Sequence, residues 1–187
     1  HYTQIASAIR GTIREKYWDA TRGLFADTYD HRSFSQHVNS LAILAGIVTG
    51  EEATRVMERT LNDSSLIQAT IYFRYYVHQA LKVAGMGDHL LDNLQIWRDQ
   101  MALGLTTWAE MPEPTRSDCH AWGASPNIEF FRILLGIDSN APGFKSIRIA
   151  PSLGDLKEVS GTMPHPVGSV TASYKLDKKG KLTARLI

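Results

Sequence analysis

The sequence predicts a mainly α-helical fold with a small β part near its C-terminal end. Two observations support this fold class. Between residues 3 and 101, apolar residues recur at helical spacing in segments that short polar or glycine-containing loops separate. After Gly136, apolar and polar residues alternate instead, which is typical of strands. The 187 residues suffice for one domain and part of another.

The predicted helices are of two kinds. Segments 36–48 and 66–84 carry apolar residues on most sides, which is typical of buried helices. Segments 51–61 and 88–101 each carry one apolar stripe, and segment 3–18 has apolar residues near helical spacing. A simple bundle would make every helix one-sided, whereas a two-layer ring of helical hairpins would place apolar helices inside and amphipathic helices outside. The alternation therefore favours the two-layer ring.

Strands follow the helical region. We expect them at residues 144–149, 168–176 and 181–187. Residues 177–180 have the composition of a hairpin turn between the last two strands. Three or four strands are too few for a complete β-sandwich, so we expect an antiparallel sheet or a partial sandwich. We therefore divide the chain into a helical domain at 1–137 and a β-domain at 138–187, which opens with a loop at 138–143.

The composition excludes several classes of function. A net charge of +1 and scattered Lys and Arg residues argue against a nucleic-acid partner. The histidines are spread along the chain without metal-ligand spacing, so we expect no metal or other cofactor. Cys119 is the single cysteine and cannot form an internal disulfide. No apolar run is long enough to span a membrane, so no membrane partner is expected.

Residues 105–136 hold most of the candidate functional residues. Between Trp108 and Trp122 lie three acids, an arginine and a histidine: Glu110, Glu113, Asp118, Arg116 and His120. Pro112 and Pro114 make this segment a loop, because proline lacks a backbone donor and restricts the residue before it. Polar residues on a loop before an apolar segment are common in active sites, although an ordinary loop between helices has the same composition.

The glutamates of this loop are candidates for acid–base chemistry. A carboxylate can act as a general base by taking a proton from water. Glycoside hydrolysis uses two carboxyl groups on opposite sides of a sugar, and Glu110 and Glu113 are too close in sequence to be assigned as that pair. Trp108 and Trp122 can bind a sugar through their apolar ring faces, or they can be core residues.

Asp118, Cys119 and His120 allow several roles. A Cys–His nucleophile pair is disfavoured because neighbours in a helix do not face each other, and a metal site lacks recognisable ligand spacing. His120 can hydrogen-bond a substrate hydroxyl, or it can serve as a cap or core residue. Asp118 can cap the following helix, whose start near Asp118 or at Ser125 stays open.

Longer segments resemble a known enzyme family. Thr106-Thr-Trp-Ala-Glu110 and Arg116-Ser-Asp-Cys-His-Ala-Trp-Gly-Ala-Ser-Pro126 are similar to sequences of the inverting α-L-rhamnosidases, a family of glycoside hydrolases. The segment from Gly136 to Pro151 resembles that family's passage from the catalytic domain to the C-terminal β-domain. The similarity extends over most of the chain and includes Ser35-Gln-His-Val-Asn-Ser-Leu-Ala-Ile-Leu and Tyr72-Phe-Arg-Tyr-Tyr.

The resemblance implies a fold and a site. The fold is a partial six-hairpin α/α toroid, of which residues 1–137 would form the C-terminal half. The activity is removal of terminal α-L-rhamnose with inversion, with Glu110 as the general base. His120 and Trp122 resemble the family's His-x-aromatic pair, which lines the sugar pocket. Trp108 stands one position earlier than the expected aromatic residue and is a further candidate contact, whereas Glu113 has no family role.

The same resemblance implies that part of the catalytic machinery lies elsewhere. The family's general acid comes from an earlier part of the toroid, upstream of His1, so we expect the missing N-terminal part of the same enzyme as a partner. The isolated chain is then expected to be inactive. The substrate would be a rhamnose-containing glycan or glycoside, and a periplasmic or extracellular location is favoured. The alternatives are another α/α-toroid enzyme, such as a glucosidase or a phosphorylase, a non-catalytic carbohydrate-binding piece, and a structural helical fragment.

Overall fold

A computed structural model describes residues 1–112 and 114–187. The described chain divides into two compact units, each built from two segments: His1–Met86 with Leu105–Gly123, and Gly87–Gly104 with Ala124–Ile187. Helices dominate, and the strands form small antiparallel sheets. The predicted fold class, mainly α with a small β part, is therefore confirmed.

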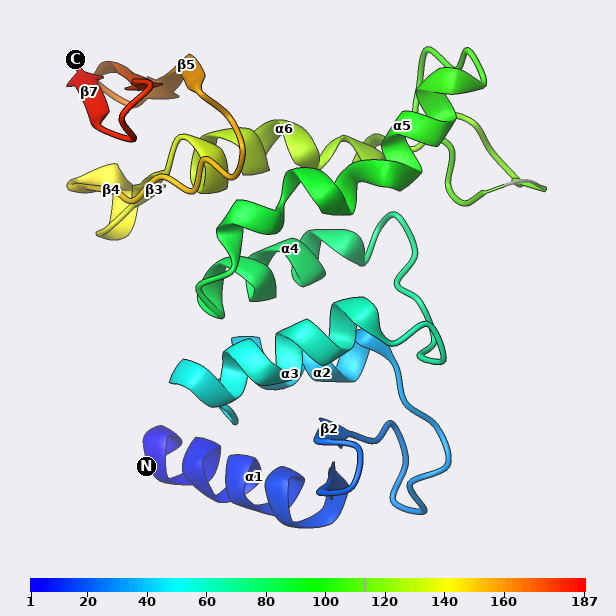
Figure 1. The fold of residues 1–187 in the computed structure, drawn as a ribbon. Coiled ribbons are helices and arrows are strands. Elements are labelled where there is room, and N and C mark those ends of the chain that lie inside the picture. Colours follow the sequence, from blue (N-terminus) through cyan, green and yellow to red (C-terminus); the bar gives the residue numbers. More distant parts are fainter. Residues whose placement is uncertain (113) are drawn as a thin grey trace. The chain divides into compact units, whose positions relative to one another are not determined.

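The first unit is mostly helical. Its elements are α1 (Tyr2–Tyr17), β1 (Trp18–Asp19), β2 (Leu24–Phe25), α2 (Gln36–Leu44), α3 (Gly50–Asn62) and α4 (Arg74–Val83). Helix α2 packs against both α3 and α4, and these helices lie side by side in Figure 1. Arg14 of α1 donates a hydrogen bond of 3.0 Å to the Glu52 carboxylate of α3. This ion pair joins α1 to α3.

Helix α2 ends at Leu44 rather than at the predicted residue 48. Gly46 adopts a positive φ of 66° just beyond the helix, and its N–H donates to the Ile43 carbonyl at 3.0 Å. The N–H of Ile47 reaches back to the Ala42 carbonyl at 2.9 Å. These two bonds form a Schellman motif, which satisfies the last carbonyl groups and stops the helix.

Helix α4 begins at Arg74, so the prediction of a helix from residue 66 is wrong. The backbone before α4 is already bound to the start of α2. Ile67 accepts a hydrogen bond from the Gln36 N–H at 3.0 Å and donates one to the Phe34 carbonyl at 2.9 Å. The N–H of Ala69 donates to the Gln36 side-chain oxygen at 2.9 Å. Because these groups have partners in another segment, they cannot form helical hydrogen bonds.

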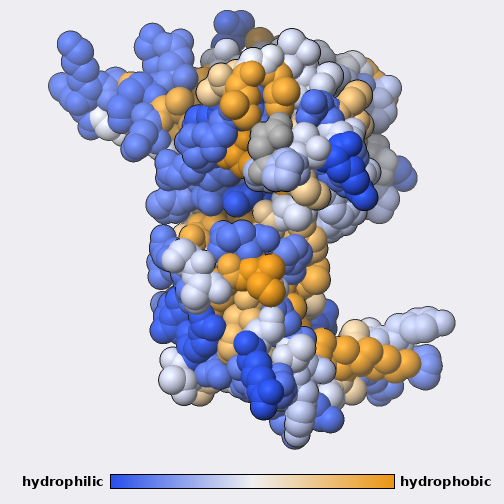
Figure 2. Space-filling model, turned by 90° about the vertical axis from the view of Figure 1, so that its right-hand side faces the viewer, coloured by the Kyte–Doolittle hydropathy of each residue, from blue (hydrophilic) through white to orange (hydrophobic). Residues whose placement is uncertain are grey.

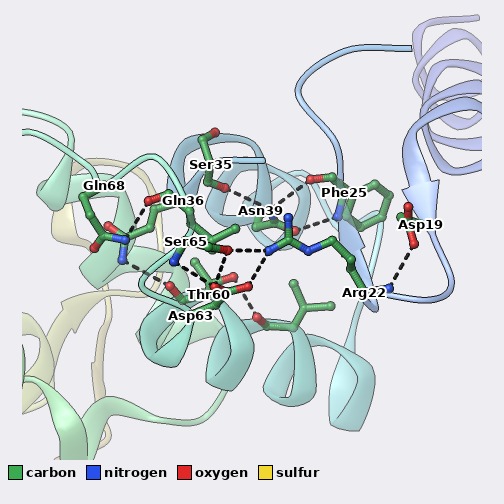
Figure 3. Close-up of polar contacts among 12 residues, drawn as sticks. Asp19, Arg22, Phe25, Ser35, Gln36, Asn39, Thr60, Asp63, Ser65 and Gln68 are labelled. Atoms are coloured by element: carbon green, nitrogen blue, oxygen red, sulfur yellow. Dashed lines mark hydrogen bonds and ion pairs between the residues drawn. The ribbon is translucent and has the colours of Figure 1, made fainter. Parts of the chain in front are cut away.

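Buried amide side chains hold the loops of the first unit in place (Figure 3). Asn39 is fully buried and binds Phe25 through both backbone groups, at 2.8 Å to its nitrogen and 3.0 Å to its oxygen. The Asn39 amide also donates to the Ser35 carbonyl at 2.9 Å. Gln36 donates in the same way to the Thr60 carbonyl at 3.1 Å. Polar side chains of α2 therefore bind the backbone of β2, of α3 and of the segment before α4.

The predicted helix 88–101 is broken in the second unit. Two 3-10 helices, Gly87–His89 and Leu91–Leu94, precede α5 (Gln95–Ala102). Helix α6 (Pro126–Glu129) continues into the π-helical turn Phe130–Leu134. Pro126 occupies the first turn of α6, where its missing N–H costs nothing.

The strands of the second unit form two antiparallel sheets. They are β3 (Ile137–Ser139), β4 (Ile147–Ile149), β5 (Glu158–His165), β6 (Gly168–Leu176) and β7 (Leu182–Leu186). Strands β3 and β4 pair with each other, and the larger sheet has the order β5-β6-β7. The predictions for the last two strands and their turn are confirmed, because the Gly180 N–H donates to the Asp177 carbonyl at 3.1 Å. Three other predictions differ from the structure. Residues 138 and 139, predicted as part of a loop at 138–143, belong to β3, and only residues 147–149 of the predicted strand 144–149 form a strand. Strand β5 was not predicted.

An apolar core joins the larger sheet to the helical turn before β3. Its buried members are Leu135, Ile137, Met163, Ala172 and Tyr174. The Tyr174 hydroxyl donates to the Leu135 carbonyl at 2.9 Å, so the polar end of this buried ring is satisfied. Burial raises the pKa of Tyr174.

Some apolar side chains stay at the surface. Figure 2 shows separate hydrophobic patches among hydrophilic residues on the face that it presents. Tyr2, Ile5 and Ile9 of α1 are exposed, and α1 has no buried residue. Among the described residues, no helix has both the length and the apolar character needed to cross a membrane.

Candidate active site

The loop Leu105–Gly123 folds back on itself within the first unit. The Glu110 N–H donates to the Ser117 carbonyl at 2.9 Å, and the His120 N–H donates to the Trp108 carbonyl at 2.8 Å. The Thr107 hydroxyl adds a bond of 2.5 Å to the Asp118 carbonyl. Two stretches of the loop therefore run side by side, which brings Glu110 close to His120.

The Glu110 carboxylate is largely buried and doubly bound. Its side chain is 12% exposed, and both oxygens accept hydrogen bonds from Arg116, with Nε to Oε2 at 2.6 Å. These hydrogen bonds lower the pKa of Glu110, against the opposing effect of burial, and the nearby charges of Arg116 and His120 act in the same lowering direction. Glu110 is therefore ionised at neutral pH, which suits a proton acceptor.

His120 lies between Glu110 and an aromatic ring. Its Nε2 is 3.8 Å from Glu110 Oε1, and its ring centroid is 4.5 Å from that of Trp122. Its Nδ1 is buried and has no hydrogen-bond partner among residues 1–112 and 114–187. A buried nitrogen without a partner is costly, and a catalytic role is one explanation for such an atom.

Trp122 meets an aromatic residue from a distant part of the chain. The rings of Trp122 and Tyr72 are 5.6 Å apart and inclined at 72°, an edge-to-face contact. Tyr72 lies in the turn before α4, which the sequence had predicted to be helical. The Tyr72-Phe-Arg-Tyr-Tyr similarity was the available signal, but it did not indicate which ring would meet the loop.

Trp108 is in the same loop, but its surroundings are those of a packing residue. It is half-buried, and a Cβ placed on Gly123 would lie 2.5 Å from the Trp108 Cβ and 3.5 Å from Ile71 Cδ1. Trp108 therefore packs closely on Gly123. Glu113 lies outside the described residues.

The other polar residues of this segment, Asp118 and Cys119, are exposed. The carbonyl of Asp118 binds Thr107. Helix α6 begins at Pro126 with Ser125 as its N-cap residue, so of the two starts considered the later one is correct. Cys119 is an exposed free cysteine. In the described part of the chain, no three His, Cys, Asp or Glu side chains gather as a metal site.

Comparison with known proteins finds similarity to rhamnosidases. The model of the bacterial α-L-rhamnosidase C-terminal domain matches residues 136–186. The crystal structure of a GH78 family rhamnosidase of Bacillus sp. GL1 is 27% identical over 95% of this chain, with a TM-score of 0.80. The chain is thus similar to the GH78 α-L-rhamnosidases, through its C-terminal residues in the family model and through most of its length in the Bacillus structure. The resemblance to α-L-rhamnosidases predicted from the sequence is thus confirmed.

The chain is shorter than these similar proteins. It spans about a fifth of the Bacillus enzyme, 21% of that chain. A structure of a rhamnosidase from Klebsiella oxytoca with rhamnose bound covers 70% of this chain, and the match spans 28% of the Klebsiella chain. The sequences are 21% identical and the TM-score is 0.62, so this similarity concerns the fold alone. No curated protein matches the chain.

Proposed function

We propose that this chain is part of an enzyme that hydrolyses terminal α-L-rhamnosides with inversion, with Glu110 as the general base. One observation carries the proposal. A largely buried, ionised carboxylate lies beside His120 and the half-exposed Trp122. An ionised oxygen with lone pairs left over from Arg116 can accept a proton from water, and aromatic rings beside it suit a sugar.

In this mechanism Glu110 takes a proton from water while the water oxygen attacks the anomeric carbon. The bond between that carbon and the leaving-group oxygen breaks, and a general acid protonates the departing oxygen. In inverting enzymes the two carboxyl groups stand about 6.5–9.5 Å apart, with the water between base and sugar. The attacking water and the leaving group are therefore on opposite faces of the sugar ring.

His120, Trp122 and Trp108 are proposed as the wall of the rhamnose site. The His120 imidazole can hydrogen-bond a sugar hydroxyl, and the Trp122 face can lie on the apolar side of the ring. Trp108 contributes by supporting Gly123, so its part is support more than direct contact.

The general acid is proposed to come from another part of the same enzyme. The chain spans about a fifth of the Bacillus rhamnosidase, and the exposed apolar residues of α1 offer a surface for further protein. Residues 1–137 would then be the C-terminal half of a six-hairpin α/α toroid, and residues 138–187 would begin the β-domain. The boundary at 137 stays a prediction.

Glu110→Gln tests the catalytic assignment in the intact enzyme. The amide keeps the size of the side chain but cannot accept the proton, so hydrolysis of an aryl α-L-rhamnoside should fall by about 10²–10⁴-fold. The fold should persist, as circular dichroism can verify. Glu51→Gln is the matched control, because that side chain is 95% exposed on α3. Near-normal activity of Glu110→Gln would refute the assignment.

The isolated chain tests the origin of the acid. Purified residues 1–187 should not hydrolyse an aryl α-L-rhamnoside, because protonation of the leaving group needs the second carboxyl group. Turnover by this chain alone would show that the acid lies within it. Rhamnose binding by the intact enzyme without any hydrolysis would instead favour a carbohydrate-binding function.

A further inference from the structure

Tyr72 lies at the end of a row of ring contacts that starts near Glu110. His120 is next to the carboxylate, Trp122 packs on His120, and Tyr72 packs on Trp122, with ring centroids 4.5 Å and 5.6 Å apart for the two ring pairs. All four residues belong to the first compact unit. The row of contacts therefore connects the proposed base, Glu110, with Tyr72.

The turn that carries Tyr72 is firmly held. Ile71 is fully buried, and its Cδ1 lies against Gly123, next to Trp122. The Arg74 N–H closes the turn by donating to the Thr70 carbonyl at 3.0 Å. The Tyr72 ring also contacts Tyr76, at 6.3 Å between centroids, and a hydrogen bond with Tyr72 raises the pKa of Tyr76. Tyr72 is thus fixed at its backbone, ring and hydroxyl.

Although fixed, both rings remain half in solvent. Tyr72 is 50% exposed and Trp122 is 45% exposed. Ordered aromatic rings that present an apolar face to water lose little conformational entropy when a ligand covers them. A flat ring with an apolar face, such as a pyranose or an aryl group, fits this pair of side chains.

The position of Tyr72 relative to Glu110 indicates which part of the ligand it would meet. In the proposed inverting reaction, the base lies on the face opposite the leaving group. A rhamnose ring beside Glu110, His120 and Trp122 would direct its leaving group away from the carboxylate. Tyr72 lies at the end of the row that is away from the carboxylate.

We propose that Tyr72 and the adjoining part of Trp122 form a binding site for the ring carried by the leaving group, which is the ring to which rhamnose is attached. This site rests on the proposed function and extends it. The ring can be a second sugar or an aryl group, since both offer an apolar face. Tyr72 then determines which rhamnosides are preferred without taking part in bond cleavage.

The test compares leaving groups with and without a ring. The intact enzyme and its Tyr72→Ala and Tyr72→Phe variants are assayed with methyl α-L-rhamnoside, an aryl α-L-rhamnoside and a rhamnosyl-glucoside. Tyr72→Ala should lower kcat/KM by about tenfold for a substrate with a ring, the loss expected for one stacking contact. Methyl rhamnoside should stay within about twofold, and this substrate also verifies that the variant is folded. Tyr72→Phe keeps the ring and should stay near the wild-type rate for all three.

Tyr29→Ala is the matched control, because Tyr29 is an exposed tyrosine of the same unit, at 72% exposure. It should change none of the rates. A selective loss for the glucoside identifies a sugar as the bound ring, and a selective loss for the aryl substrate identifies an aryl group. An equal change for all three substrates, or no change, would overturn the binding site at Tyr72 but not the proposed function. A wild-type enzyme that hydrolyses no rhamnoside would overturn the proposed function.

Discussion

At the scale of single residues, Arg116 sets both the orientation and the pKa of the Glu110 carboxylate. It binds both oxygens, although its own side chain is 76% exposed. A bidentate arginine fixes the orientation of a carboxylate as well as its charge. Because the hydrogen bonds from Arg116 are the main cause of the lowered pKa of Glu110, we expect this contact to be visible in the pH dependence of catalysis.

Arg116→Ala should move the acidic limb of the kcat/KM profile to higher pH. A general base works only when ionised, so the rate falls as the pH drops through its pKa. Removing Arg116 raises that pKa, and activity is then lost at a higher pH than in the wild type. Arg116→Lys keeps the charge without the paired hydrogen bonds and should shift the limb less. Rates measured across the acid range on the intact enzyme check this.

Arg55→Ala serves as the control, because Arg55 is also an exposed arginine paired with a glutamate, at 3.5 Å from Glu51. Its profile should coincide with that of the wild type. If the Arg116→Ala profile coincides as well, Arg116 has no part in the ionisation of Glu110.

Glu110, His120 and Trp122 could be proposed from the sequence because they belong to one ordered motif. The contact between Arg116 and Glu110 could not, since it depends on the backbone pairing of Glu110 with Ser117. Tyr72 was missed for a similar reason. Its place beside the loop depends on tertiary packing, which local spacing does not contain.

At the scale of elements, the buried amides of α2 decide where other segments can be helical. The spacing of apolar residues correctly predicted that α3 is a helix. This helix buries Ala53, Val56 and Met57, which belong to the apolar stripe predicted for this segment. The prediction failed for residues 66–73, because α2 takes their backbone hydrogen bonds. A helical pattern is a local property, whereas this competition comes from a segment far away in sequence.

Asn39→Ala should destabilise the first unit by about 3 kcal/mol, because it removes the side-chain partner of both buried backbone groups of Phe25. Denaturant unfolding followed by circular dichroism measures the loss. Asn62→Ala, at the exposed end of α3, should change the unfolding free energy by less than about 0.5 kcal/mol. Equal effects of the two substitutions would contradict the bridging role of Asn39.

At the scale of the whole chain, the change from helical to strand pattern occurs at Gly136. The family model begins at the same residue. Strands β6 and β7 were predictable because they alternate and share a hairpin turn. Strand β5 was not, since Gly161 and Pro164 interrupt its pattern, and its pairing with β6 defines it.

Gly136→Ala should destabilise the second unit by about 3–5 kcal/mol, since a Cβ there would overlap the backbone of Ala150 and the φ is +67°. Gly143 provides a close control with a φ of +69° and open space around it. Gly143→Ala should cost only about 1–2 kcal/mol. Thermal unfolding of both variants compares them, and a Gly143→Ala loss as large as that of Gly136→Ala would exclude the overlap as the cause.

Gln36 has a consequence for how the sequence of this chain can diverge. It touches none of the proposed sugar contacts, yet its amide joins Thr60 to Ala69 and so holds the segment that leads to Tyr72. A replacement at position 36 would shift Tyr72 while leaving the Glu110 motif unaltered. Relatives with the same motif can therefore acquire new substrate preferences, and we expect residues at positions 36 and 72 to covary among them.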